Sequence, residues 1–278
     1  WEKTFGGSGN DGAYSIQQTK DKGFIVAGST ASTNGDVQPR NNEYDPWILK
    51  LDYNGNLQWQ KPIDLGKEGW SKAIEQTFDF GYISAATRSE REGNTNLSDF
   101  CIFKLDSSGG LLWVKIMDDN DISDKFANSI HQTYDKGYIA AGNRILRGLD
   151  SAGNKHRSDF YIVKFDSLGN VKWQNIYGGY FQDELNSMQV TFEKGYILSG
   201  YTSIFNGDNE HFDFLILNLD INGNNSIPWW RVLNNQGIIT IKGNWSATKE
   251  LQANLLKKDG VKVSAKFTID MEKYRLRN

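Results

Sequence analysis

The chain of 278 residues contains few residues of several types, and each shortage excludes a class of protein or a kind of structure. It has one cysteine, Cys101, so no disulfide within the chain can cross-link the fold. It has four prolines against twenty-eight glycines, so its turns depend mainly on glycine. No run of about 18 apolar residues occurs, which argues against direct membrane insertion. The net charge of −3 disfavours a general nucleic-acid or membrane-surface binder.

The sequence does have an internal repeat. The stretch "DKGFIVAG" (21–28) returns as "DFGYISAA" (79–86), "DKGYIAAG" (135–142) and "EKGYILSG" (193–200). The glycines of the four copies are 58, 56 and 58 residues apart (Gly23, Gly81, Gly137 and Gly195). A period of this length is typical of arrays in which each unit is one small β-sheet.

Three further features recur in the same order. An aspartate opens an apolar run in every copy (Asp45, Asp99, Asp159 and Asp213). An Asp-x-x-Gly turn follows (Asp52, Asp106, Asp166 and Asp220). A tryptophan stands four residues after that glycine in three copies, at Trp59, Trp113 and Trp173, and a two-residue insertion moves the fourth to Trp229. Because they repeat in register, we interpret the Asp and Gly residues as turn formers and not as catalytic groups.

Each unit is predicted to contain four short strands, which in the first copy are residues 14–19, 23–28, 46–52 and 57–61. We expect the glycine of both turn types to adopt the positive φ that the turn needs. The segments between the second and third strands differ between copies and are predicted to be loops (29–44, 87–98, 143–158 and 201–212).

The third strand of each unit is apolar on both faces, which places it between two packed sheets. Four-stranded antiparallel units stacked face to face define a β-propeller. The predicted fold is therefore an all-β propeller with four clear blades in residues 1–233, near 6–63, 64–117, 118–177 and 178–233. A parallel β-helix is the second choice, since its rungs are shorter.

Residues 234–278 do not repeat the pattern, but 237–243 and 251–269 have the character of three strands. The segment "WEKTF" (1–5) resembles a fourth strand without the other three. We therefore predict a degenerate fifth blade, in which strand 1–5 joins the C-terminal strands and closes the ring. The alternative is a separate small β module at 234–278.

The stretches "WEKTFGGSGNDGAYSIQQTKDKGFIVAGST" and "DPWILKLDYNGNLQWQK" closely resemble the tandem repeat of secreted and surface proteins common in Bacteroidota. The resemblance covers about 230 residues. It fails at Leu65-Gly66 and Asp118-Asp119, where Gly-Gly is expected, and throughout 234–278. It implies an extracellular propeller, secreted or on the cell surface, and associated with the outer membrane if the cell is Gram-negative. A chain that starts at Trp1 fits an exported, processed protein. The family carries no agreed catalytic residues.

Residues that break the repeat are the candidates for function, because chemistry and recognition usually depart from symmetry. We predict a ligand-binding surface on the face that carries the variable loops, with Trp70 as an aromatic platform. The other candidates are Arg88, Asn143, Arg144, Tyr180 and Tyr201. The competing interpretation of Trp70 is packing under the neighbouring blade.

Metal and catalytic signals are poor. His131 falls in a strand at a position where other copies have Gln17, Glu75 and Gln189, and the loop residues His156 and His211 have no metal-ligand spacing. Asp118, Asp119, Asp121 and Asp124 form a calcium candidate, because carboxylate oxygens at this spacing can hold calcium, but the glycine and glutamate of a calcium loop are missing; the alternative is a solvated acidic turn. No cofactor is predicted.

The predicted function is a non-catalytic binding or scaffold module that recognises a glycan, a peptide or a partner protein of a surface complex. The alternatives are a glycan-cleaving enzyme with carboxylates in the central funnel, or a structural spacer in a larger surface assembly.

Overall fold

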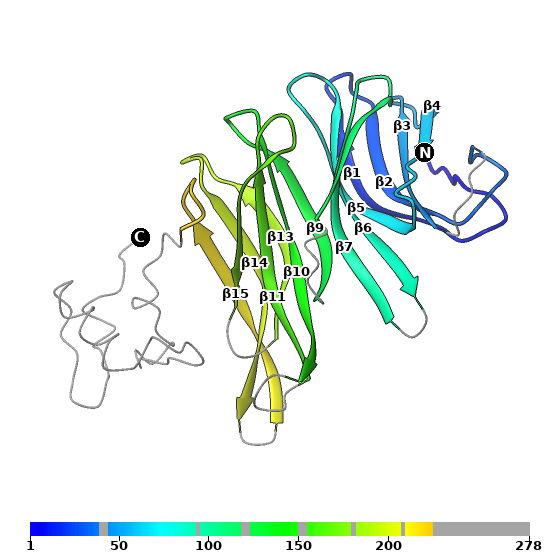
Figure 1. Ribbon diagram of the computed structural model, residues 1–278. Helices are drawn as coiled ribbons and strands as arrows, with labels where there is room; N and C mark the ends of the chain where they lie inside the picture. Colours follow the sequence, from blue (N-terminus) through cyan, green and yellow to red (C-terminus); the bar gives the residue numbers. More distant parts are fainter. Residues whose placement is uncertain are drawn as a thin grey trace, which may run out of the picture.

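The computed structural model describes residues 1–38, 44–92, 95–117, 123–149, 155–178, 182–206 and 209–224. These residues form fifteen strands in four antiparallel sheets that lie side by side in a row (Figure 1). Sheet I contains β1 (Asp11–Gln18), β2 (Phe24–Thr30), β3 (Asp45–Leu51) and β4 (Leu57–Pro62). Sheet II contains β5 (Glu68–Gln76), β6 (Tyr82–Glu92), β7 (Thr95–Leu105) and β8 (Leu111–Ile116). Sheet III contains β9 (Ser123–Gln132), β10 (Tyr138–Leu149), β11 (Lys155–Phe165) and β12 (Val171–Tyr177). Sheet IV contains β13 (Asp183–Val190), β14 (Tyr196–Asn206) and β15 (Asn209–Leu219).

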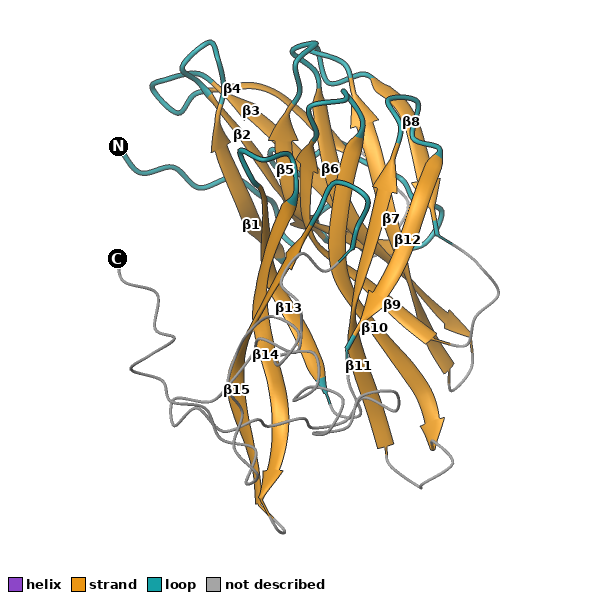
Figure 2. Ribbon diagram, turned by 90° about the vertical axis from the view of Figure 1, so that its left-hand side faces the viewer, coloured by secondary structure: helices purple, strands orange, loops and turns teal. Residues whose placement is uncertain are grey.

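The strand order in every sheet follows the chain, and each strand pairs with the next one. Figure 2 shows strands and connections only, with no helix in the described part of the chain. The prediction of an all-β fold built from four-stranded antiparallel units is therefore confirmed for sheets I to III. The parallel β-helix is excluded because all described pairs of strands are antiparallel. The predicted fifth blade and the alternative module at 234–278 lie outside the described residues, as does Trp229.

Sheets pack face to face through apolar clusters that repeat along the row. Between sheets I and II, Ile25 and Ile48 pack against Cys101 and Phe103. Equivalent residues of sheet II meet sheet III, and those of sheet III meet sheet IV. Because the third strands β3, β7 and β11 carry apolar residues on both faces, they are buried on both sides, as the sequence predicts.

The repeated tryptophan connects each sheet to the next. The ring of Trp59 in β4 packs against Tyr82 of sheet II with centroids 5.7 Å apart. The same ring lies over Gly109, where an added Cβ would approach it to 2.9 Å. Trp113 and Trp173 make the same pair of contacts with the following sheets. Glycine is therefore needed in this turn both for its positive φ and for the room it leaves the ring.

The N-terminal Trp1 makes this contact on sheet I. It packs against Phe24 with centroids 5.9 Å apart and lies over Gly55, although residues 1–7 do not form a strand with a described sheet. Trp1 thus occupies the place that a fourth strand of a preceding sheet would supply. In the described part of the chain it remains 69% exposed.

The Asp-x-Gly turn differs from the prediction. The positive φ falls on the residue before the glycine, at Lys22, Phe80, Lys136 and Lys194. The glycine is required for a different reason, because a Cβ on Gly137 would lie 2.2 Å from the Phe165 carbonyl oxygen. Close approach of two backbones, and not backbone conformation, therefore selects glycine at this position.

The predicted loops between second and third strands are wrong for three of the four sheets. In sheets II, III and IV the two strands continue through 87–92 and 95–98, 143–149 and 155–158, and 201–206 and 209–212 as long hairpins. In sheet I, the described residues 31–38 after β2 do not continue the strand. For sheets II and IV the sequence signal was a Gly-Asn or Gly-Asp dipeptide (93–94 and 207–208), which is typical of two-residue hairpins, between segments that pair residue by residue.

Sheet IV differs from the other sheets in having one uncovered face. Phe214 and Ile216 of β15 are 94% and 59% exposed, and Ile197 of β14 lies beside them. The same face of sheets I to III is buried under the following sheet. The described residues contain no sheet that covers this surface.

Candidate functional site

The sheets present two different ends. We call the end with the turns at residues 19–23, 77–81, 133–137 and 191–195 the turn end, and the opposite end the loop end. The first strands β1, β5, β9 and β13 lie next to one another, joined by hydrogen bonds such as that from the Gln76 N–H to the Gln17 side chain (2.7 Å). We call them the inner strands.

Trp70 lies at the loop end of inner strand β5, half-buried and paired with Thr87. The same position holds Phe126 in sheet III and Glu184 in sheet IV, each also half-buried. One position of the inner strands therefore carries a different partly accessible side chain in each of these sheets.

Tyr201 lies beside Glu184 in sheet IV. Its ring packs edge-to-face on Phe212, with centroids 5.2 Å apart, and Phe212 is itself exposed. Burial, followed by the hydrogen bond and charge of Glu184, raises the pKa of the Tyr201 hydroxyl to about 12. Tyr201 is thus a neutral hydrogen-bonding group on an exposed aromatic pair.

The other predicted residues take part in internal contacts. Arg88 is paired with Asp99 through two hydrogen bonds of 3.0 and 2.5 Å. The Asn143 side chain accepts a hydrogen bond from the Leu185 N–H (2.7 Å), which ties sheet III to sheet IV. Arg144 donates to the Ser123 hydroxyl (3.2 Å). These side chains help to hold the loop end together, and among the five described candidates only Asn143 is buried.

Tyr180 lies outside the described residues, as do Asp118, Asp119 and Asp121 of the calcium candidate and the side chains of His156 and His211. Asp124 is described and buried, and it accepts a hydrogen bond from the Ser98 N–H (3.0 Å). No group of three His, Cys, Asp or Glu side chains suited to a metal occurs among the described residues.

A polar hollow of about 550 Å³ lies at the loop end of sheet I, formed by the glycine-rich segment 6–10 with Asp11 and Asp36. The Gly6 N–H donates to Asp36 (3.1 Å) and the Gly7 N–H to Asp11 (2.9 Å). Burial opposes the charge of Asp11, but hydrogen bonds from Thr30, Ser32 and Gly7 lower its pKa. Because the carboxylates already take these backbone donors, the glycine-rich loop is not a phosphate cradle.

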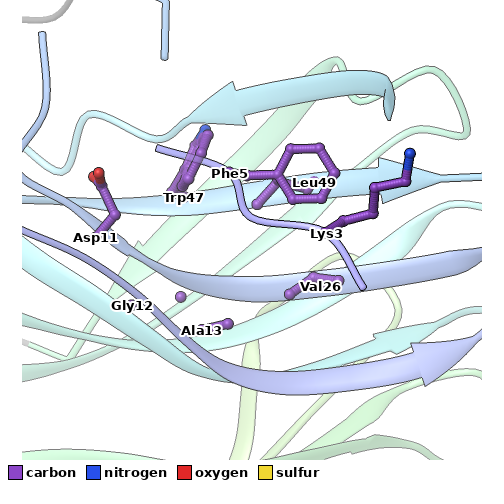
Figure 3. Close-up of a pocket in the computed structure, with 9 residues that line it drawn as sticks. Lys3, Phe5, Asp11, Gly12, Ala13, Val26, Trp47 and Leu49 are labelled. Carbon is purple, nitrogen blue, oxygen red and sulfur yellow. The ribbon is translucent and has the colours of Figure 1, made fainter. Parts of the chain in front are cut away.

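An apolar hollow of about 150 Å³ lies between the N-terminal segment and the face of sheet I (Figure 3). Phe5 covers it, and Val26, Trp47 and Leu49 form its floor. The equivalent face of sheet II is filled by sheet I. The charged residues Lys3 and Asp11 also line the hollow. It lies on the face of sheet I that corresponds to the covered face of sheet II.

Comparison of the chain with protein-family models and with curated proteins finds no match. The described residues include no helix of the length and apolar character that crossing a bilayer requires.

Proposed function

We propose that this protein is a non-catalytic binding or scaffold module, exported to the cell surface or secreted, which recognises a glycan, a peptide or a partner protein through its loop end. The resemblance of its repeat to bacterial surface proteins supports the location. The repeated residues support the fold and leave the loop end free to vary, which is the usual division between scaffold and recognition surface.

The observation that carries this proposal is the set of unlike residues at one position of the inner strands. Trp70, Phe126 and Glu184 replace one another there, while the turns, the buried apolar residues and the tryptophan contacts stay the same. Aromatic side chains beside a carboxylate and the Tyr201 hydroxyl present an apolar face with polar edges. Sugars and peptides are both recognised by such surfaces.

The test is binding of the purified chain to an array of polysaccharides and oligosaccharides, with Trp70→Ala measured in parallel. We expect specific binding that Trp70→Ala weakens about tenfold or more, which corresponds to about 1.4 kcal/mol. Tyr53→Ala is the matched control, since Tyr53 is an exposed aromatic residue in a turn at the opposite end. If Trp70→Ala binds like the parent chain, the loop-end surface is contradicted. If no glycan binds, co-purification from the native surface tests for a protein partner.

We further propose that the sheets form a closed five-bladed propeller, with a fifth blade from residues 234–278 and strand 1–5. Two features support it: Trp1 already sits on Phe24 and Gly55 as a fourth-strand tryptophan does, and sheet IV has an uncovered apolar face. In a closed ring, Trp1→Ala should cost about 3 kcal/mol in unfolding free energy, like Trp113→Ala. A cost below about 0.5 kcal/mol, as for a surface residue, would favour a separate C-terminal module.

A further inference from the structure

The inner strands carry a ladder of hydrogen bonds between sheets at the turn end, and its first two steps are alike. From sheet I to sheet II, Gln17 accepts from the Gln76 N–H (2.7 Å), and Gln76 accepts from the Lys20 N–H (2.8 Å). From sheet II to sheet III, Glu75 accepts from the Gln132 N–H (3.2 Å), and Gln132 accepts from the Phe78 N–H (2.6 Å). Each step uses two side-chain oxygens to pair two backbone donors.

The third step, from sheet III to sheet IV, has lost both acceptors. The position of Gln17 and Glu75 holds His131, whose Nε2 donates to the Met188 carbonyl (2.7 Å). The position of Gln76 and Gln132 holds Val190, which has no side-chain acceptor. As a result, the N–H groups of Tyr134 and Val190 have no hydrogen-bond partner among the described residues.

A hollow of about 380 Å³ opens where the ladder is broken. It lies between the turn ends of sheets II and III and inner strand β13, and both Tyr134 and Val190 line it. Its size falls at the small end of the range of about 300–1,000 Å³ found for ligand pockets. Phe78 and Tyr134, each about half exposed, give it aromatic walls, and the exposed Gln189 side chain supplies an amide.

The charge in the hollow is balanced internally. The carboxylate of Glu75 is 2.6 Å from His131 Nδ1. Burial lowers the pKa of the His131 imidazole, but the hydrogen bond and the charge of Glu75 outweigh burial and raise it. Lys and Arg are absent from the described lining. A carboxylate already paired with imidazolium does not hold a second cation, and an anion would find no countercharge. The chemistry favours an uncharged ligand.

We propose that this hollow is a second binding site, which takes one neutral pyranose ring of a saccharide. The apolar face of the ring would stack on Phe78 or Tyr134, its hydroxyl and ring oxygens would accept from the two unpaired N–H groups, and Gln189 would bind a further hydroxyl. An extended peptide fits less well, since it needs a continuous row of backbone donors and acceptors and finds two donors only. The site does not depend on the loop-end surface proposed above.

Two substitutions that restore the repeat provide the test. Val190→Gln supplies an acceptor for the Tyr134 N–H, as Gln76 and Gln132 do in the earlier steps. His131→Gln supplies one for the Val190 N–H, as Gln17 does for Gln76. Both should preserve the fold and remove the site. The probes are the methyl glycosides of glucose, galactose, mannose and N-acetylglucosamine. Their binding is measured by saturation-transfer NMR and by the chemical-shift changes of the Tyr134 and Val190 amides.

We expect one or more glycosides to bind at millimolar concentration and to shift both amides, and each substitution to weaken binding about tenfold or more. Tyr53→Ala controls for an exposed aromatic residue at the same end and should not change the binding. The amide shifts of Tyr134 and Val190 separate this site from the loop end, because both residues line the hollow. The proposal is overturned if no glycoside binds, or if binding persists at full strength in Val190→Gln and His131→Gln.

Discussion

Strands β11 and β15 have the same place in consecutive repeats but opposite surroundings. Phe160 in β11 is fully buried, and Phe214 at the equivalent position of β15 is 94% exposed. Ile162 and Ile216 differ in the same way. Because the residue types are alike, the difference arises from the neighbouring sheet and not from the strands themselves. An apolar third strand therefore indicates a covering sheet on each side, and among the described residues β15 has one on one side only.

The third and fourth repeats also differ in a buried lysine, which sheet III has and sheet IV lacks. Lys164, buried in β11, donates to Asp135, to the Thr133 hydroxyl and to the Phe165 carbonyl, each at 3.0 Å. In sheet IV these positions hold Asn218 and Glu193, yet the turn still forms, with the Lys194 N–H donating to the Thr191 carbonyl (3.0 Å). The Gly195 N–H also donates to the Thr191 hydroxyl in this turn (3.2 Å). The turn therefore forms without the Lys–Asp pair, which is an addition in the buried interfaces of sheets I to III.

The largest effect should come from truncating the paired phenylalanines. Phe160→Ala should lower the unfolding free energy by about 4 kcal/mol, because it leaves a cavity between sheets III and IV. Phe214→Ala should cost about 2 kcal/mol or more if the proposed fifth blade covers it. Denaturant unfolding of both variants measures the difference. A Phe214→Ala variant as stable as the parent would show that this face stays open.

Removing the buried ammonium should have the next largest effect. Lys164→Met keeps the apolar stem but removes the ammonium group that donates to the Thr133 hydroxyl and the Phe165 carbonyl and pairs with Asp135. We therefore expect a loss of about 3 kcal/mol in unfolding free energy. Asn218→Met in sheet IV is the matched substitution and should cost less than about 1 kcal/mol. Equal losses in thermal or denaturant unfolding would mean that the two repeats do not differ as described.

Low pH should reduce the unfolding free energy through the three repeats that have an aspartate in the Asp-x-Gly turn (Asp21, Asp79 and Asp135). Burial opposes the charge of Asp21, but hydrogen bonds from Lys50 and Thr19 lower its pKa from 3.8 to about 2. The pKa values of Asp79 and Asp135 are also lowered, because hydrogen bonds from the neighbouring threonine and lysine outweigh burial. A depressed folded-state pKa contributes stability above pH 3.8, and that contribution is lost as the pH falls towards 2. Unfolding measured between pH 5 and pH 2 should show this loss, with a shallower slope for Asp21→Asn. An unchanged slope would contradict the assignment.

The smallest effect concerns a feature that sheets III and IV share. Lys136 and Lys194 both have positive φ, at 64° and 67°. Glycine relieves that conformation but adds entropy to the unfolded chain, so each Lys→Gly variant should gain about 0.5 kcal/mol. Similar gains in both variants, measured by thermal unfolding, are expected; a gain in one alone would mean that the two turns are strained differently.

The recurring pattern was sufficient to predict the fold. The candidate site was harder to predict, because it depends on the contacts of individual side chains. Recurrence of Asp-x-Gly and Trp was sufficient for the four strands per unit and for the two-sided burial of β3, β7 and β11. The hairpins of sheets II to IV were missed because their polar sequences resemble loops, although pairing continues through them. Arg88 and Asn143 were chosen for breaking the repeat, yet their side chains are occupied by Asp99 and Leu185. The turn-end hollow was not predicted, since a missing acceptor becomes visible only when the inner strands are aligned in space.

The tryptophan contact has a consequence for how such a chain can change in evolution. Each contact uses a tryptophan from one unit and a glycine and an aromatic ring from the next, so its parts come from two consecutive units only. A duplicated unit would bring both halves with it, and a deleted unit would leave matching halves behind. None of these contacts depends on the total number of units. Whole units can therefore be gained or lost in evolution without disturbing the contacts between the remaining units. The two ends of the array, in contrast, need new contacts after each such change.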